Sequence, residues 1–205
     1  MINWIIFDYG GVISYFQDKK CIKRICNVLS ITKEQYKSVY QKERYNYDAA
    51  KIDAEQYWNK INGYYNKKSL SQKDLSELIF YDVISWSKIN KKTISLIKRL
   101  KNINMKLSIL SNMNFEFLEY LIKKEKWFKY FDNRVFSCEI NLIKPDEEIY
   151  KFILKQISEQ PENVLFIDDS ESNILTAKKL GMNTIHFKNN HDVEKIIKEN
   201  YNINI

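Results

Sequence analysis

The sequence predicts an α/β fold, a doubly wound parallel sheet with a helical domain inserted after the first strand. Three observations predict it. In the second half of the chain, short apolar runs alternate with segments of helical periodicity, which is typical of parallel sheets. The first apolar run, residues 4–7, ends at an acid and a glycine turn. Between these two parts, residues 18–80 show only helical spacing.

The first strand, predicted over residues 4–7, organises the rest of the chain. This run is bulky and uncharged, as expected of a strand buried on both faces. Asp8 ends it, and Gly10 and Gly11 follow, two of only four glycines in the protein. Adjacent glycines indicate a positive φ or a close approach of the backbone. An acid at this point lies where open α/β sheets bind ligands, although an edge turn with a solvated aspartate is the alternative.

The helical insertion is predicted over residues 15–85, and residues 1–14 and 86–205 would form the core. Three residues are expected to cap helices within the insertion, namely Thr32, Asp53 and Ser71. The insertion is rich in tyrosine, and most of its aromatic side chains are expected to form its own small core. Four aromatic residues are suggested as substrate contacts: Tyr15, Tyr40, Tyr57 and Trp58.

After the insertion, strands and helices alternate to the end of the chain. Further strands are predicted over residues 106–110, 134–136, 163–167 and 184–187. Helices are predicted over residues 93–100, 115–124, 146–156, 173–180 and 193–199. Gly181 stands where a helix commonly ends.

Composition narrows the class of protein. Of the 205 residues, 44% are hydrophobic, enough for a sizeable core. The formal charge of +7 could indicate an anionic partner, but the lysines are spread and no nucleic-acid motif is present, so no nucleic-acid partner is expected. Three cysteines, an odd number, favour a reduced cytoplasmic protein over a disulfide scaffold. Neither a signal peptide nor a membrane span is expected.

Chemistry-bearing residues follow the predicted strands where each one ends. In a parallel sheet these ends meet at one edge, which would collect Asp8, Ser111, Asn112, Lys144, Asp168 and Asp169. Three clustered carboxylates would repel one another and take up protons unless a divalent cation lay between them. Hard oxygen ligands suit Mg²⁺. Lys144 and Ser111 could hold a dianion beside the metal, helped by backbone N–H groups of the glycine turn and of the helix after Ser111.

Four motifs, in order, carry a resemblance to a known family. They are Asp8-Tyr9-Gly10-Gly11-Val12, Leu110-Ser111-Asn112, Lys144-Pro145-Asp146 and Phe166-Ile167-Asp168-Asp169-Ser170 with Asn173. With them, the chain resembles hydrolases of the haloacid dehalogenase (HAD) superfamily, subfamily IA, which have a Rossmann-like core and a helical cap. The resemblance covers residues 1–14 and about 90–187, and the cap matches only in position and helical character.

The resemblance implies roles for the matching residues. Asp8 would be the nucleophile and would form an aspartyl phosphate. Ser111 would hydrogen-bond a phosphoryl oxygen, and Lys144 would neutralise the phosphoryl group and the nucleophile. Magnesium would be held mainly by Asp169, with Asp168 in support, by Asp8 and by the backbone carbonyl of Gly10.

Three further residues have less certain roles in this resemblance. Gly11 would belong to the phosphate-binding turn together with Gly10. Asn112 would contact the phosphorylated substrate or cap the helix that follows it, two alternatives of equal weight. Asn173 would support the metal site or cap its own helix, and the second interpretation is favoured.

The position of Gly10 departs from the usual phosphatase motif of the family. That motif has an aspartate there, which protonates the leaving group and then activates water, a role typically worth about 10²–10⁴-fold in rate. A branch resembling sugar-phosphate phosphatases also has glycine at this position. Neither His186 nor His191 is expected to replace the acid. Without it, esters with acidic leaving groups should react far better than alkyl phosphates. Gly10 is also expected to need a φ that aspartate adopts only at a cost.

The sequence thus predicts a magnesium-dependent phosphatase that hydrolyses a small phosphorylated metabolite, for example a sugar phosphate, through an aspartyl phosphate. Two alternatives remain. A degenerate member, lacking an acid at Gly10, would bind a phosphorylated ligand or a protein partner with little turnover. A haloacid dehalogenase would use the same Asp8 without a metal, and the pair Asp168-Asp169 argues against it.

Overall fold

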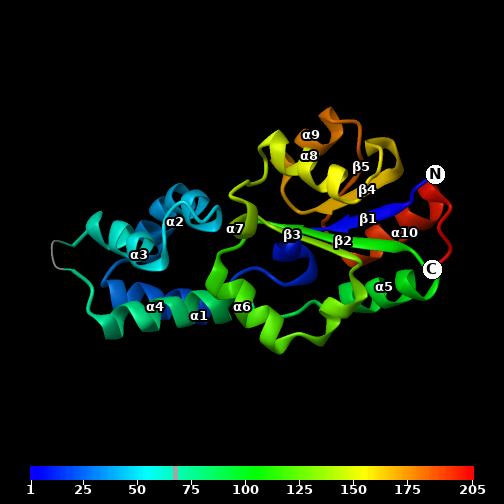
Figure 1. Cartoon of the computed structure of the whole chain (residues 1–205). Helices are drawn as coiled ribbons and strands as arrows, with labels where there is room; N and C mark the ends of the chain where they lie inside the picture. Colours follow the sequence, from blue (N-terminus) through cyan, green and yellow to red (C-terminus); the bar gives the residue numbers. More distant parts are fainter. Residues whose placement is uncertain (67–68) are drawn as a thin grey trace.

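The computed structural model describes residues 1–66 and 69–205, and its centre is a parallel five-stranded sheet (Figure 1). The strands are β1 (Trp4–Phe7), β2 (Lys106–Ser111), β3 (Asn133–Phe136), β4 (Val164–Asp168) and β5 (Asn183–His186). Their order is β3-β2-β1-β4-β5, and every neighbouring pair is parallel. The predicted fold class is therefore confirmed. Ile5 and Ile6 of the central strand β1 are both 0% exposed, so this strand is buried on both faces as predicted.

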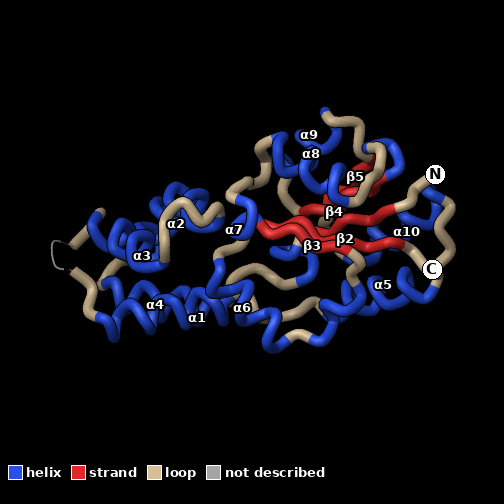
Figure 2. The backbone as a smooth tube through the Cα atoms, in the orientation of Figure 1, coloured by secondary structure: helices blue, strands red, loops and turns tan. Residues whose placement is uncertain are grey.

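Helices cover both faces of the sheet (Figure 2). One face packs against α5 (Lys91–Asn102), α6 (Phe115–Lys124) and α10 (Asn190–Tyr201), and the other against α8 (Glu147–Gln156) and α9 (Glu171–Lys179). Because side chains of a strand alternate, Ile5 faces the first group and Ile6 the second. Three short helical segments were not predicted, because they are too short to show a period: Lys126–Tyr130, α7 (Ser137–Ile140) and Pro161–Asn163.

A second group of helices packs around a core of its own. It comprises α1 (Lys19–Leu29), α2 (Lys33–Asp48), α3 (Ala54–Gly63) and α4 (Gln72–Ser85). Thr32, Asp53 and Ser71 cap α2, α3 and α4 with reciprocal capping boxes, so these three sequence predictions are confirmed. The cap boundaries at residues 15 and 85 stay a prediction, and residues 67–68 of that range lie outside the described part. No described helix is long and apolar enough to cross a membrane.

The chain leaves and re-enters the core at one place. Ser14 and Ile89 form an antiparallel bridge, and the backbone N–H of Asn90 donates to the carbonyl of Ile13 at 2.8 Å. This paired connection follows the turn Tyr9–Ile13, directly after β1. The helices α1–α4 therefore extend beyond the carboxyl ends of the strands, where Figure 1 shows them.

Candidate active site

The acidic residues predicted at the sheet edge come together in the structure. Asp8 follows β1, Asp168 ends β4 and Asp169 is the next residue. A carboxylate oxygen from each of the three lies within 4.8 Å of the others. Such a group of oxygen ligands can hold a hard divalent cation.

Lys144 connects two of these acids. Its Nζ atom lies 2.7 Å from Oδ1 of Asp8 and 2.7 Å from Oδ2 of Asp168, and its side chain is 1% exposed. Asn112 fixes the backbone of Lys144: its Nδ2 donates to the Lys144 carbonyl at 2.8 Å, and its Oδ1 accepts from the Lys144 N–H at 2.9 Å. Asn114 caps α6 instead, so the capping alternative for Asn112 was wrong.

Asp168 is held from several sides and is 0% exposed. The Nδ2 group of Asn173 donates to both of its carboxylate oxygens at 3.0 Å, and the N–H of Ser170 donates to Oδ1 at 2.8 Å. The favoured interpretation of Asn173 as a helix cap was therefore wrong, because α9 begins after Ser170 and the Asn173 side chain binds Asp168. Because these donors and Lys144 occupy the carboxylate oxygens of Asp168, this residue positions Lys144. Asp169 is the more exposed of the two acids.

Burial and mutual repulsion change the titration of the acidic group. Burial raises the pKa of Asp8 to about 7; Lys144 opposes this shift, and the charges of Asp168 and Asp169 add to it. Burial and the charge of Asp168 raise the pKa of Asp169 to about 6. The single positive charge of Lys144 therefore does not compensate all three carboxylates. A divalent cation at this position would supply the further positive charge and keep Asp8 ionised.

The glycine turn shows two different reasons for glycine. Gly11 has a φ of 74°, and a Cβ atom there would lie 2.8 Å from the Asp169 carboxylate, so the expected positive φ and close approach both occur. Gly10 has an ordinary φ of −67° and ψ of 128°. The expectation that aspartate would be strained at Gly10 was therefore wrong. A Cβ atom at Gly10 would instead contact the ring of Trp86 at 3.4 Å.

A cavity of about 210 Å³ opens above these residues, between the core and the helices α1–α4. Its core-side lining includes Asp8, Gly10, Ser111, Asn112, Lys144 and Asp169. The lining residues from the segment between residues 15 and 86 are Phe16, Tyr40, Arg44, Asp48 and Trp86. Tyr40 is the one suggested cap contact among the described lining residues. Tyr57 and Trp58 are 0% exposed inside the α1–α4 core, Tyr15 lies outside the cavity at 47% exposed, and all three suggestions were wrong.

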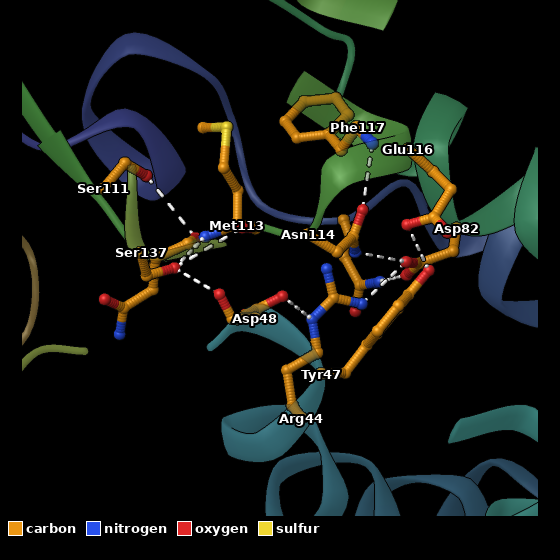
Figure 3. A network of polar contacts seen from close by, with 12 residues as sticks. Arg44, Tyr47, Asp48, Asp82, Ser111, Met113, Asn114, Glu116, Phe117 and Ser137 are labelled. Carbon is orange, nitrogen blue, oxygen red and sulfur yellow. Dashed lines mark hydrogen bonds and ion pairs between the residues drawn. The ribbon is translucent and has the colours of Figure 1, made fainter. Parts of the chain in front are cut away.

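Sequence reasoning missed a charged network on the cap side of the cavity (Figure 3). Arg44 of α2 points between two acids: its Nε lies 2.8 Å from Oδ1 of Asp48, and a terminal nitrogen lies 2.6 Å from Oδ2 of Asp82. The side chains of these acids are 9% and 2% exposed. The available signal was the i,i+4 spacing of Arg44 and Asp48 on a helix that also carries buried aromatic residues.

The two histidines take no part in the cavity. His186 is exposed, and its Nε2 lies 2.8 Å from the backbone carbonyl of Asp169. The His191 side chain is 87% exposed. Neither is among the described residues that line the cavity.

A family model described as a haloacid dehalogenase-like hydrolase matches residues 2–181. The chain belongs to the haloacid dehalogenase-like hydrolases. The resemblance inferred from the four motifs is thereby confirmed. Along its whole length, this HAD chain is similar to the D-ribitol-5-phosphate phosphatase of Bacteroides thetaiotaomicron. The two are 22% identical over 204 residues, which cover 94% of this chain and 95% of that enzyme.

Shorter segments match much longer proteins. The rat bifunctional epoxide hydrolase 2 is 42% identical over 57 residues, which cover 28% of this HAD chain and 10% of that enzyme. The matches span only 10% to 20% of the length of the first three such relatives. The match to this rat enzyme is therefore a match to one segment and not to the whole protein.

Solved structures of HAD enzymes share the fold. A HAD family enzyme of Bacteroides thetaiotaomicron, solved as a magnesium complex, has a TM-score of 0.79 at 21% identity, over 97% of this chain and 99% of that one. The same enzyme in complex with magnesium and inorganic phosphate has a TM-score of 0.74 at 22% identity, over 92% and 95%. At such identities the likeness establishes the architecture of this HAD chain and leaves its substrate open.

Proposed function

We propose that this HAD hydrolase is a magnesium-dependent phosphatase that hydrolyses a small phosphorylated metabolite through an aspartyl phosphate on Asp8. The observation that carries the proposal is the contact of Asp8 with Lys144 beside the acidic pair Asp168-Asp169, all at one cavity. A nucleophilic carboxylate, a fixed cation and a metal-binding group are the parts that phosphoryl transfer to an aspartate requires.

The residues fit a magnesium ion. Asp8, Asp169 and the backbone carbonyl of Gly10 would hold it, with Asp168 in support, and the bound ion would neutralise charge on the phosphoryl group. Titration points the same way, because Asp8 and Asp169 have raised pKa values that a cation would lower.

Each of the remaining site residues has a role in the first step, the transfer of the phosphoryl group to Asp8. Asp8 attacks phosphorus, and Lys144 balances the charge of the transferred phosphoryl group while it orients Asp8. Ser111, 1% exposed at the end of β2, hydrogen-bonds a phosphoryl oxygen. Asn112 and the turn at Gly10 and Gly11 complete the phosphate-binding side, and Asn112 does so by holding the backbone of Lys144.

A sugar phosphate or polyol phosphate is the substrate class that the relatives favour. One relative is the D-ribitol-5-phosphate phosphatase described above, and another is a phosphorylated carbohydrates phosphatase of Thermotoga maritima, 40% identical over 58 residues. A cytoplasmic location, with a small molecule as the partner, belongs to the same proposal.

Phosphate release from a panel of phosphate monoesters tests the proposal. Wild type with Mg²⁺ should release phosphate, whereas EDTA or the substitution Asp8→Asn should abolish release. Asp192→Asn, on the exposed start of α10, is a matched control that should retain full activity. Retention of full activity in EDTA would refute the metal mechanism. Absence of turnover with every ester would favour a degenerate protein that only binds its ligand.

A further inference from the structure

Gly10 has no side chain that could donate a proton to the leaving group. Another carboxyl group that lines the cavity could do so. Three described carboxylates line it: Asp8, Asp169 and Asp48. The first two belong to the nucleophile and metal side, whereas Asp48 comes from α2. We propose that Asp48 is the general acid and base of this site. The proposal rests on the proposed phosphatase function.

Asp48 lines the same cavity of about 210 Å³ as the proposed nucleophile Asp8. An ester whose phosphorus contacts Asp8 would therefore share this cavity with the Asp48 side chain. General acids must lie within hydrogen-bond reach of the proton acceptor, directly or through one water.

Contacts from the core fix Asp48 in place. Ser137, which follows β3, donates its hydroxyl proton to the carbonyl of Asp48 at 2.5 Å, and Asn141 donates to the carbonyl of Ala49 at 2.9 Å. The hydroxyl of Ser137 also accepts from the N–H of Met113, two residues beyond Ser111 (Figure 3). The end of α2 is thus attached to the same loop that follows β2, and Asp48 keeps its place relative to Ser111.

The carboxylate of Asp48, which lines the cavity, is only partly occupied by hydrogen bonds from the described residues. Its Oδ1 accepts from Nε of Arg44, and no described residue hydrogen-bonds to Oδ2. Arg44 is shared with Asp82, which also accepts from Gln17 at 3.4 Å and from Asn114 at 3.5 Å. A single guanidinium therefore faces two buried carboxylates. Since Asp82 has more donors, Asp48 is the less fully hydrogen-bonded member of the pair.

Titration of Asp48 agrees with this geometry. Burial raises its pKa to about 6, the charge and hydrogen bond of Arg44 lower it, and the charges of Asp82 and Glu116 raise it further. A pKa near the working pH is what a general acid and base requires. The titratable groups that face Asp48 from the surrounding helices are Tyr40, Arg44, Tyr57, Asp82, Glu116 and Cys138.

The proton balance closes over the two steps. In the first, the bond from phosphorus to Asp8 forms, the bond to the leaving oxygen breaks, and the carboxyl proton of Asp48 moves to that oxygen. In the second, water attacks phosphorus, its proton passes to the Asp48 carboxylate, and the bond to Asp8 breaks. Phosphate and the starting form of both residues result.

A leaving-group series tests the role of Asp48. The measurement is kcat/KM with Mg²⁺ for aryl and alkyl phosphates of increasing leaving-group pKa, in wild type, Asp48→Asn and Glu43→Gln. Glu43 is a matched control, because it is a buried acid of α2 that bonds Tyr64 and Lys60 away from the cavity. For Asp48→Asn, kcat/KM should fall by about 10²–10⁴-fold with alkyl phosphates and only a little with aryl phosphates. Its plot of log kcat/KM against leaving-group pKa should therefore be steep. Wild type and Glu43→Gln should share a shallow plot, in place of the strong preference for acidic leaving groups that the sequence predicts from Gly10 alone.

A pH profile separates this role from a structural one. With alkyl phosphates, kcat/KM of wild type should fall as pH rises through about 6, because the acid must be protonated, and Asp48→Asn should lack this limb. Asp48→Glu should restore part of the alkyl activity. An equal loss with every ester, or a wild-type plot as steep as that of Asp48→Asn, would overturn the role of Asp48 alone. Absence of phosphate release by wild type from any ester would overturn the phosphatase function and this inference together.

Discussion

The Nζ atom of Lys144 lies 2.7 Å from Oδ1 of Asp8, the proposed nucleophile. The same ammonium lies 2.7 Å from Oδ2 of Asp168, which is fully buried. Burial lowers the pKa of Lys144, but the attraction of Asp168 and Asp8 outweighs it, so the pKa is raised and the lysine stays charged. One cation therefore links the proposed nucleophile to a fixed acid.

Replacement of Lys144 by methionine should lower kcat by about 10²–10³-fold, because a fixed charge at the transferred group is lost. Lys151→Met is the matched control, since Lys151 is half exposed and pairs with Glu147 and Glu148 on the surface of α8. Steady-state turnover of an aryl phosphate measures the effect, and circular dichroism checks the fold. Near-normal turnover in Lys144→Met would show that this lysine is not part of the chemistry.

Substitutions of Asp169 and Asn173 should differ in their effect on magnesium binding. Asp169→Ala removes a proposed direct ligand, whereas Asn173→Ala removes only a donor to Asp168 and should weaken binding by about 10–100-fold at most. Calorimetric titration with Mg²⁺ should therefore give the larger rise in Kd for Asp169→Ala. Equal effects of the two substitutions would contradict Asp169 as the principal ligand.

The two adjacent glycines should respond differently to alanine. Gly11→Ala should destabilise the protein by more than about 1 kcal/mol, since its φ is positive and a Cβ would meet Asp169 at 2.8 Å. Gly10→Ala should change the free energy of unfolding by less than about 0.5 kcal/mol, because its φ is ordinary. Denaturant unfolding measures both. A larger loss for Gly10→Ala would mean that contact with Trp86 dominates.

Much of the site was predictable because parallel strands end at a common edge. The uncharged run before Asp8 identifies a buried strand, and similar apolar runs precede Ser111 and Asp168. Local sequence was therefore enough to predict that these three residues lie at one edge of the sheet. The positive φ of Gly11 was equally local, since scarce adjacent glycines indicate such a turn.

Other parts were not predictable, because they depend on partners distant in the sequence. Asn112 binds the backbone of Lys144, which is 32 residues away, and local spacing left a helix cap and a substrate contact as equal alternatives. On α2, periodicity indicates which residues share a face, but it does not show which part of the core that face meets. The positions of Arg44 and Asp48 at the cavity therefore emerged only from the packing of α2 against the core.

The free energy of unfolding should depend on pH through the titration of Asp48. Its pKa is about 6 in the folded protein against an ordinary value of 3.8, so the folded state binds the proton more tightly. The resulting stabilisation is complete below pH 4 and is lost as pH rises through 6. Relative to that of Asp48→Asn, the free energy of unfolding of wild type should therefore fall by up to about 3 kcal/mol between pH 4 and 7. Denaturant unfolding at a series of pH values measures this difference, and a constant difference would refute the raised pKa.

A covalent intermediate on Asp8 is the central claim, and acid-quenched turnover tests it most directly. The protein is mixed with an aryl phosphate and Mg²⁺, quenched within the first turnover, and digested for peptide mass spectrometry. The peptide that contains Asp8 should carry one added phosphoryl group, and it should remain unmodified when EDTA is present. Release of phosphate in excess over the protein, with the Asp8 peptide unmodified at every quench time, would contradict the mechanism.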